Sequence, residues 1–308
     1  MDQKIPTPRI VAIIQARLDS TRLPGKVLMD IAGKPMLAHV VERTRRAKWL
    51  DEVVVATTTE EEDQPIVSFC ENAQIPFFRG SEYDVLDRYY QAAQYFKAEV
   101  VVRITADCPL IDPVVIDDVI EKFFFWGSSN SESCREDNGM DLSLAEEKSG
   151  KLKPRWDFAA NRLPPPWKRT FPIGLDTEIC TFAALAQAWR AAQQPFYREH
   201  VMPYIYDPDH SVHYSTLDKS QTAVEVPSGF FKVLVVDHDP DYGHYRWTVD
   251  TEEDLLLLRE IFAHFDNQNR MSWQDVLNLF QDHPELGQIN ATVHPKTVSE
   301  IDQRGLKP

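Results

Sequence analysis

The sequence predicts an α/β fold with a mostly parallel sheet that is covered by helices on both faces. Three observations support this prediction. Continuous apolar runs alternate with helix-like stretches, several of the runs are rich in β-branched residues, and prolines stand at helix starts at Pro35 and Pro113. Strands buried on both faces read as unbroken apolar runs, and this is the pattern seen here.

The elements follow in order along the chain. Strands are expected at residues 10–14, 53–57, 76–78, 100–104, 157–160, 175–180 and 231–236. Helices are expected at residues 35–46, 63–72, 84–96, 113–125, 197–206, 251–264 and 273–280. A further helix is expected to follow the strand at 175–180 and to end at residue 192. We expect residues 1–265 to form the main domain, with a polar insertion or loop at 127–154, and residues 266–308 to form a C-terminal helix and a polar tail.

Composition narrows the class of function. The 308 residues carry a net charge of -15, and such an acidic surface repels nucleic acid and anionic lipid, so we expect neither as a partner. The four cysteines form no C-x-x-C pair, which indicates reduced thiols. No apolar run approaches the roughly 20 residues that span a bilayer, and the polar N-terminus has no signal-like core, so a cytoplasmic location is expected.

The most informative segment is QARLDSTRLPGK at residues 15–26, which follows the first predicted strand. It combines three cationic side chains and two hydroxyls with a Pro-Gly turn. A triphosphate needs backbone N–H donors and cations of this kind. It is not a Walker A loop, because Val27 follows Lys26 and the upstream glycine is missing. The alternative is a polar surface loop with solvated Arg and Lys.

Two aspartates are candidate metal ligands. Asp107 follows the strand at 100–104, and Asp250 is expected at the end of a short strand before the helix at 251–264. Mg²⁺ is typically held by one or two carboxylates together with phosphates and water, so this pair would suffice. The alternatives are a turn role for Asp107 and a helix-capping role for Asp250.

These segments together resemble a known family. The matching stretches run in collinear order from residue 10 to 255: IVAIIQARLDSTRLPGKVL, DEVVVATTT, FRGSEYDVLDRYYQAA, VVRITADCPLIDPVVID, RTFPIGLDTEI, YREHVMPYI and RWTVDTEEDL. The chain resembles the cytidylyltransferases that activate sugars such as 3-deoxy-manno-octulosonate and acylneuraminate, and it is similar to their spore coat polysaccharide biosynthesis protein F branch. The resemblance implies a Rossmann-like nucleotide-diphospho-sugar transferase fold, with residues 1–265 as the nucleotidyltransferase domain.

The resemblance also implies roles for individual residues. The phosphates of the nucleotide would be wrapped by Gln15, Ala16, Arg17, Ser20, Arg22 and Lys26. The base and ribose would lie near Gly80, Asp87 and Arg88. The sugar would lie near Glu178, Arg198, Glu199 and His200. Mg²⁺ would be bound by Asp107 and Asp250, and catalysis would rest on these two residues with Arg17 and Lys26.

The implied reaction is attack by a sugar oxygen on the α-phosphorus of CTP with release of pyrophosphate, for the synthesis of a surface polysaccharide or glycan. From the family likeness we expect a homodimer. Ala106 stands where the family usually has glycine, and Asp19 puts an acid inside the phosphate loop. One alternative is a glycosyltransferase that uses a nucleotide-sugar donor, for which the D-x-D string at 237–239 would be the metal motif. The other is a non-catalytic nucleotide-binding module.

Overall fold

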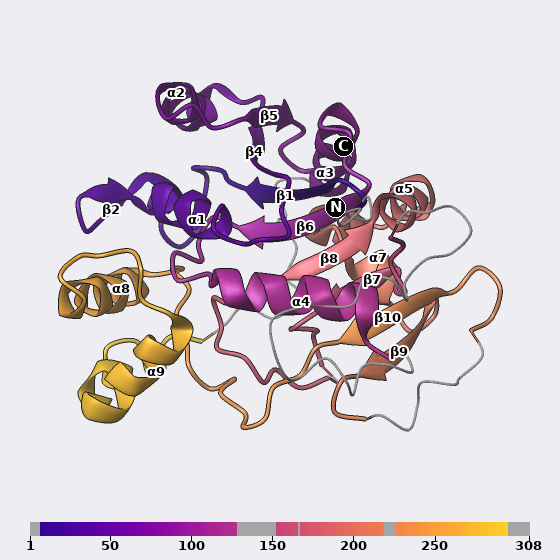
Figure 1. Cartoon of the computed structure of the whole chain (residues 1–308). Helices are drawn as coiled ribbons and strands as arrows, with labels where there is room; N and C mark the ends of the chain where they lie inside the picture. Colours follow the sequence, from indigo (N-terminus) through magenta and orange to yellow (C-terminus); the bar gives the residue numbers. More distant parts are fainter. Residues whose placement is uncertain (1–6, 128–151, 166, 219–225, 295–308) are drawn as a thin grey trace, which may run out of the picture.

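A twisted eight-stranded sheet forms the centre of the molecule (Figure 1). The structure is a computed structural model that describes residues 7–127, 152–165, 167–218 and 226–294. The strand order is β5-β4-β1-β6-β8-β7-β10-β9, and neighbours are parallel except where β8 pairs with β6 and β7. The predicted α/β fold with a mostly parallel sheet is therefore confirmed. Most of the predicted insertion at 127–154 lies outside the described residues.

The strands of this sheet are β1 (Ile10–Gln15), β4 (Glu52–Thr58), β5 (Phe77–Gly80), β6 (Val100–Thr105), β7 (Phe158–Ala160), β8 (Glu178–Thr181), β9 (Ser211–Ser215) and β10 (Phe231–Val235). A small hairpin pairs β2 (Asp30–Ile31) with β3 (Lys34–Pro35). The α-helices are α1 (Met36–Thr44), α2 (Gln64–Asn72), α3 (Val85–Tyr95), α4 (Pro113–Phe125), α5 (Phe182–Ala191), α6 (Pro195–His200), α7 (Pro203–Tyr206), α8 (Glu252–His264) and α9 (Trp273–Asp282).

The central strand β1 shows why both faces of the sheet are covered. Ile10, Ala12 and Ile14 belong to one buried cluster, whereas Val11 and Ile13 belong to another. Successive side chains of a strand point to opposite faces, so a continuous apolar run needs a core on each side. Helices α1, α4, α8 and α9 contribute to the first core, and α3, α5 and α7 contribute to the second.

Parallel pairing brings two chemically rich loops together. β1 lies between β4 and β6 and runs parallel to both, with Gln15 opposite Ala56 and Thr105. The loop after β1 and the loop after β6 therefore leave the same edge of the sheet. Ligands of open parallel sheets bind at this edge, beyond the carboxyl ends of the strands.

Two sequence-based predictions differ from the structure. The helix expected at 197–206 is two short helices, because Val201 takes a positive φ of 73° and Pro203 starts a new helix. Asp250 does not end a strand: near it the structure has an isolated bridge between Ile173 and Arg246. The strands β2, β3 and β9 were not predicted. Residues from the C-terminal region, such as Trp273 and Phe280, pack in the first core.

Candidate active site

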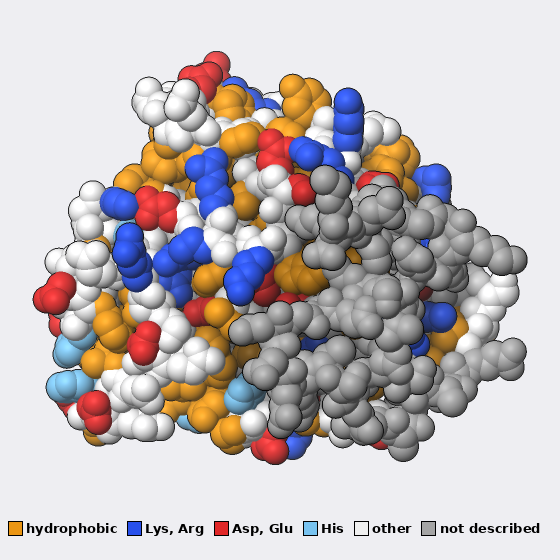
Figure 2. All heavy atoms as spheres, viewed as in Figure 1, with side chains coloured by type: hydrophobic (Ala, Val, Ile, Leu, Met, Phe, Trp, Pro, Cys, Tyr) orange, Lys and Arg blue, Asp and Glu red, His pale blue; other side chains and the backbone are white. Residues whose placement is uncertain are grey.

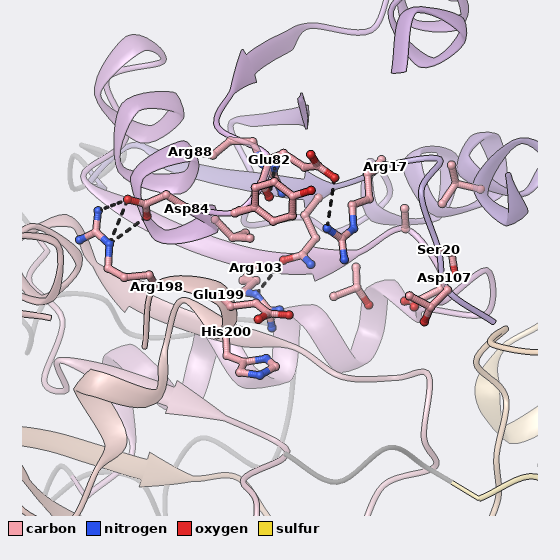
Figure 3. A pocket seen from close by; sticks show the side chains of 18 of the residues that line it. Arg17, Ser20, Glu82, Asp84, Arg88, Arg103, Asp107, Arg198, Glu199 and His200 are labelled. Carbon is pink, nitrogen blue, oxygen red and sulfur yellow. Dashed lines mark hydrogen bonds and ion pairs between the residues drawn. The ribbon is translucent and has the colours of Figure 1, made fainter. Parts of the chain in front are cut away.

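A cavity of about 480 Å³ opens beyond the carboxyl ends of β1 and β6. Sequence-predicted residues that line it are Gln15, Ala16, Arg17, Ser20, Arg22, Lys26, Arg88, Asp107, Arg198, Glu199, His200 and Asp250. Gly80, Asp87 and Glu178 are not among the described residues that line the cavity. In Figure 3 the labelled side chains extend from Asp107 and Ser20 at one end to Arg198 at the other. On the face seen in Figure 2, several Lys and Arg side chains gather to the left of the centre.

The loop after β1 is held in shape by its backbone. The Leu18 N–H donates to the buried Asp63 carboxylate at 2.7 Å, and the Gly25 N–H donates to the Leu18 carbonyl at 2.8 Å. Gly25 adopts a left-handed conformation with φ of 75°, which glycine enters without steric cost. The chain then forms the 3-10 helix Lys26–Leu28, so the loop closes on itself and turns Lys26 inward.

Lys26 joins the two candidate metal ligands. Its ammonium donates to the Asp107 carboxylate at 2.8 Å, to the Asp250 carboxylate at 2.9 Å and to the Val249 carbonyl at 2.7 Å. The residue is only 7% exposed. Burial lowers the pKa of Lys26, but the two carboxylates outweigh that effect and hold the pKa above its ordinary value. Two aspartates from distant segments thus share one cation.

Asp250 is surrounded by further positive charge. Its second carboxylate oxygen accepts from Arg246 at 2.7 Å and forms an ion pair with Arg22 at 2.6 Å. Burial alone would raise the pKa of Asp250, but Lys26, Arg246 and Arg22 outweigh it and hold the pKa well below its ordinary value. Asp250 is therefore ionised across the physiological range.

Arg88 provides a cation on the far side of the loop after β1. Its guanidinium donates to the Ser81 carbonyl at 2.6 Å, and burial lowers its pKa to about 10, so it stays charged at neutral pH. Gly80 explains how the Arg88 side chain fits. A Cβ atom at Gly80 would lie 3.0 Å from Cγ of Arg88, closer than ordinary contact allows. Gly80 is thus placed to make room for Arg88, and Arg88 is the residue that reaches the cavity.

The opposite end of the cavity holds two arginines that are paired with acids. Arg103 donates to Glu178 at 2.6 Å and to the Gln15 side chain at 3.2 Å. Arg198 contacts Asp84 through three hydrogen bonds of 2.5–3.1 Å (Figure 3). Glu178 is buried behind Arg103, which is why Arg103 rather than Glu178 reaches the cavity.

The carboxylate of Asp87 binds other side chains of the protein and does not line the cavity. Its carboxylate accepts from the Trp189 indole N–H at 2.8 Å and from the Gln91 amide at 3.2 Å. Its own N–H is bound by the side chain of Asp84, which caps α3. Asp87 therefore ties α3 to α5, and its neighbour Asp84 lines the cavity in its place.

Sequence comparison identifies the family of the chain that forms this cavity. A sequence profile described as cytidylyltransferase matches residues 11–225, which is more than two thirds of the chain. The chain belongs to the cytidylyltransferase family. It is therefore a nucleotidyltransferase, and the predicted relationship is confirmed.

Two curated relatives and one solved structure match this cytidylyltransferase along most of their length. It is 28% identical to the spore coat polysaccharide biosynthesis protein SpsF of Bacillus subtilis, over 90% of this chain and 95% of that protein. It is 29% identical to a 3-deoxy-manno-octulosonate cytidylyltransferase of Solibacter usitatus, over 82% of this chain and 94% of that protein. A cytidylyltransferase structure from Leptospira borgpetersenii superposes with a TM-score of 0.70 at 27% identity, over 94% of this chain and all of that one.

Several lining residues of this cytidylyltransferase escaped the sequence analysis, notably Glu82, Tyr83, Asp84 and Arg103. A signal existed for Arg103, because it is the one charged residue in the run Val100–Thr105. A charge in a strand covered on both faces needs a partner or a ligand. No comparable signal marked Tyr83 or Glu82, which lie in an irregular loop.

The D-x-D string of the glycosyltransferase alternative lies elsewhere. Asp237 and Asp239 are not among the described residues that line the cavity. Asp237 accepts from the Ser215 hydroxyl at 2.6 Å and so stabilises a turn after β10.

Within the described ranges no helix has the length and apolar character to cross a membrane.

Proposed function

We propose that this cytidylyltransferase transfers CMP from CTP to an acidic or otherwise modified sugar, with Mg²⁺ as cofactor and pyrophosphate as second product. The observation that carries the proposal is the arrangement of Asp107 and Asp250 around the Lys26 ammonium, at 2.8 and 2.9 Å, beside the loop after β1. Family membership supports the nucleotide, and the names of the two curated relatives support a sugar acceptor.

The residues fit a magnesium ion by their chemistry. In the described part of the chain, no group of three or more His, Cys, Asp or Glu side chains could hold a metal by itself. Mg²⁺ does not require one, because it usually takes one or two carboxylates and completes its shell with phosphates and water. Asp107 and Asp250 would hold the ion, which would neutralise negative charge on the phosphates.

The cations around the cavity would bind the triphosphate. Arg17, Ser20 and Arg22 lie on the loop after β1, and Arg88 faces it from α3. Lys26 would leave its carboxylate partners in part and stabilise the charge that builds on the α- and β-phosphates. Because the reaction is phosphoryl-type chemistry, positioning and charge neutralisation would account for most of the acceleration.

The acceptor sugar would occupy the other end of the cavity. Arg198, Glu199 and His200 line it there, and Arg103 reaches it with Glu178 behind. Arginine and histidine side chains suit a carboxylate, and glutamate suits sugar hydroxyls. In this proposal Glu178 acts through Arg103 and does not touch the sugar itself.

A pyrophosphate-release screen tests the proposal. The enzyme is incubated with Mg²⁺, each common nucleoside triphosphate and a panel of octulosonic and nonulosonic acids. We expect release only with CTP and an acceptor, and a loss of at least about 100-fold in Asp107→Asn. Asp237→Asn is the matched control, because it changes an aspartate of the D-x-D string and should keep the parental rate.

Two results would contradict the proposal. One is the absence of pyrophosphate with every triphosphate and acceptor pair. The other is transfer from a UDP- or GDP-sugar that is lost in Asp237→Asn and kept in Asp107→Asn, which would favour the glycosyltransferase alternative.

A further inference from the structure

A buried ion pair between Arg246 and Asp254 orients Asp250. Arg246 donates to Asp250 at 2.7 Å, and the same guanidinium forks onto both carboxylate oxygens of Asp254 at 2.9 Å. Asp254 is 0% exposed. Its carboxylate also accepts from the backbone N–H groups of Asp250 and Thr251 at 2.9 and 3.2 Å. The orientation of Arg246, and through it that of Asp250, therefore depends on Asp254.

The fifth donor to Asp254 comes from the C-terminal segment. The Asn290 side-chain NH₂ donates to the Asp254 carboxylate at 2.9 Å and to the Arg246 carbonyl at 3.1 Å. Asn290 is only 6% exposed. Both of its neighbours are acceptors, so only the NH₂ end of the amide can face them. The Asn290 amide thus links the Asp254 carboxylate to the backbone of Arg246, whose side chain binds the same carboxylate.

This part of the chain lies beyond the family profile and beyond the motif stretches that carry the sequence resemblance. The family profile ends at residue 225, and the sequence resemblance ends at residue 255. The 3-10 helix Pro284–Gln288 precedes Asn290 and anchors the segment in the first core through Leu286. A little further on, the His294 carbonyl accepts from Arg22 at 3.4 Å. The segment therefore contacts the phosphate loop as well as the support of Asp250.

We propose that Asn290 is a positioning residue for Asp250, so that the C-terminal segment completes the active site. The proposal rests on the function proposed above, in which Asp250 carries Mg²⁺. A buried carboxylate such as Asp254 needs its full set of donors. If Asn290 is lost, Asp254 and Arg246 rearrange, and Arg246 no longer fixes the second oxygen of Asp250.

Asn290→Asp is the sharpest perturbation. It keeps the size of the side chain but replaces the NH₂ donor by an acceptor, which then faces the carboxylate of Asp254. Asn290→Ala removes the donor without adding charge and is the second variant, since a buried carboxylate can prevent folding. Asn269→Ala is the matched control: Asn269 is another asparagine of the C-terminal region, and it contacts Arg43 and Glu42 instead of the site.

We expect both Asn290 variants to lower kcat roughly 10- to 100-fold, as is typical when a residue behind a metal ligand is lost. The KM for CTP should change by less than about twofold, because the triphosphate-binding side chains stay in place. Asn269→Ala should keep the parental kcat. If the Asn290 variants melt at lower temperature with the parental kcat, Asn290 is a purely structural residue and the proposal is overturned.

A second readout needs no turnover. The Nε–H of Arg246 donates to the buried Asp254 carboxylate at 2.9 Å, so we expect its NMR signal to be protected from exchange in the parent chain. We expect this signal to shift or disappear in both Asn290 variants and to persist in Asn269→Ala. A fall in kcat with an unchanged Arg246 signal would overturn the proposal. A parent chain that releases no pyrophosphate would refute the proposed function instead, and the Arg246 signal would still decide whether Asn290 positions this group.

Discussion

Replacement of Lys26 by methionine removes the cation that Asp107 and Asp250 share. Among the described residues Lys26 is the one ion-pair partner of Asp107, whereas Asp250 keeps Arg22 and Arg246. Removing one partner of a fully buried pair costs about 3–5 kcal/mol. The Asp107 and Asp250 side chains are 27% and 20% exposed, so water screens part of the effect. We therefore expect Lys26→Met to lower the free energy of unfolding by about 2–3 kcal/mol.

The assay is thermal unfolding with and without Mg²⁺. For a chain of 308 residues this loss of unfolding free energy corresponds to a fall in Tm of about 3–5 °C. In Lys26→Met the ion can replace the missing charge. At a concentration of about 100 times its Kd, Mg²⁺ binding raises the free energy of unfolding by about 2.7 kcal/mol. In the parent chain Mg²⁺ must first displace an ammonium, so its Tm should respond much less. Pyrophosphate release should stay low in Lys26→Met with Mg²⁺ present, since the cation for the phosphates is gone.

Lys34→Met is the control for loss of a lysine ion pair. Lys34 and Glu42 are 50% and 45% exposed, and such a surface pair contributes less than about 1 kcal/mol. Its Tm should therefore stay near the parental value at any Mg²⁺ concentration. If Lys26→Met and the parent chain gain the same Tm from Mg²⁺, the ion does not bind where Lys26 lies between the carboxylates, and the metal assignment is wrong.

Three further predictions concern groups around the cavity. The depressed pKa of Asp250 means that the unfolded chain binds its proton more readily than the folded chain. The stability that Asp250 contributes is therefore complete above about pH 5 and falls steadily as the pH drops through and below the pKa of the unfolded chain. Asp250→Asn should flatten this acid limb in urea titrations. Gly80→Val pushes on Arg88 and should raise the KM for CTP roughly 10-fold, and an unchanged KM would contradict the coupling of Gly80 to nucleotide binding through Arg88. Arg103→Met leaves Glu178 unpaired and should cost about 3 kcal/mol in denaturant unfolding, of which adding Glu178→Gln should recover at least half.

The fold and the cationic loop were predictable because their signals are local. Continuous apolar runs such as Ile10–Gln15 determine buried strands, and parallel strands then bring Lys26 and Asp107 to one edge of the sheet. The break between α6 and α7 carried one local signal, because Pro203 falls inside the predicted helix and proline breaks a helix interior, whereas the positive φ of Val201 carried none. The Arg103–Glu178 pair was also missed. It depends on antiparallel pairing of β6 with β8, and strand order across a sheet leaves no mark in a single sequence.

The C-terminal segment shows a different limit. Asn290 lies in a polar stretch with no periodicity, which is typical of a solvated tail. The structure nevertheless buries it, because the nearby Leu286 packs in the first core and two buried acceptors need a donor. A polar residue whose partners are far away in sequence gives no local signal of burial.

The charges around Lys26 also determine how nucleotide and metal should bind. Arg22, Lys26 and Arg246 balance Asp107, Asp250 and Asp254, so this cluster is neutral before any ligand arrives. A triphosphate brings several negative charges into it. Binding of CTP should therefore be coupled to binding of a divalent cation, each improving the affinity of the other by the same factor.

Calorimetric titration of CTP measures this coupling. We expect the Kd for CTP to be about 10-fold or more lower with Mg²⁺ than with a chelator, which corresponds to a coupling free energy of at least about 1.4 kcal/mol. Asp107→Asn removes one carboxylate of the cluster, so it should bind CTP better than the parent in the chelator and gain less from Mg²⁺. Equal Kd values with and without the ion in the parent chain would mean that Arg17 and Arg88 neutralise the triphosphate unaided, and that the two aspartates serve to hold Lys26 rather than a metal.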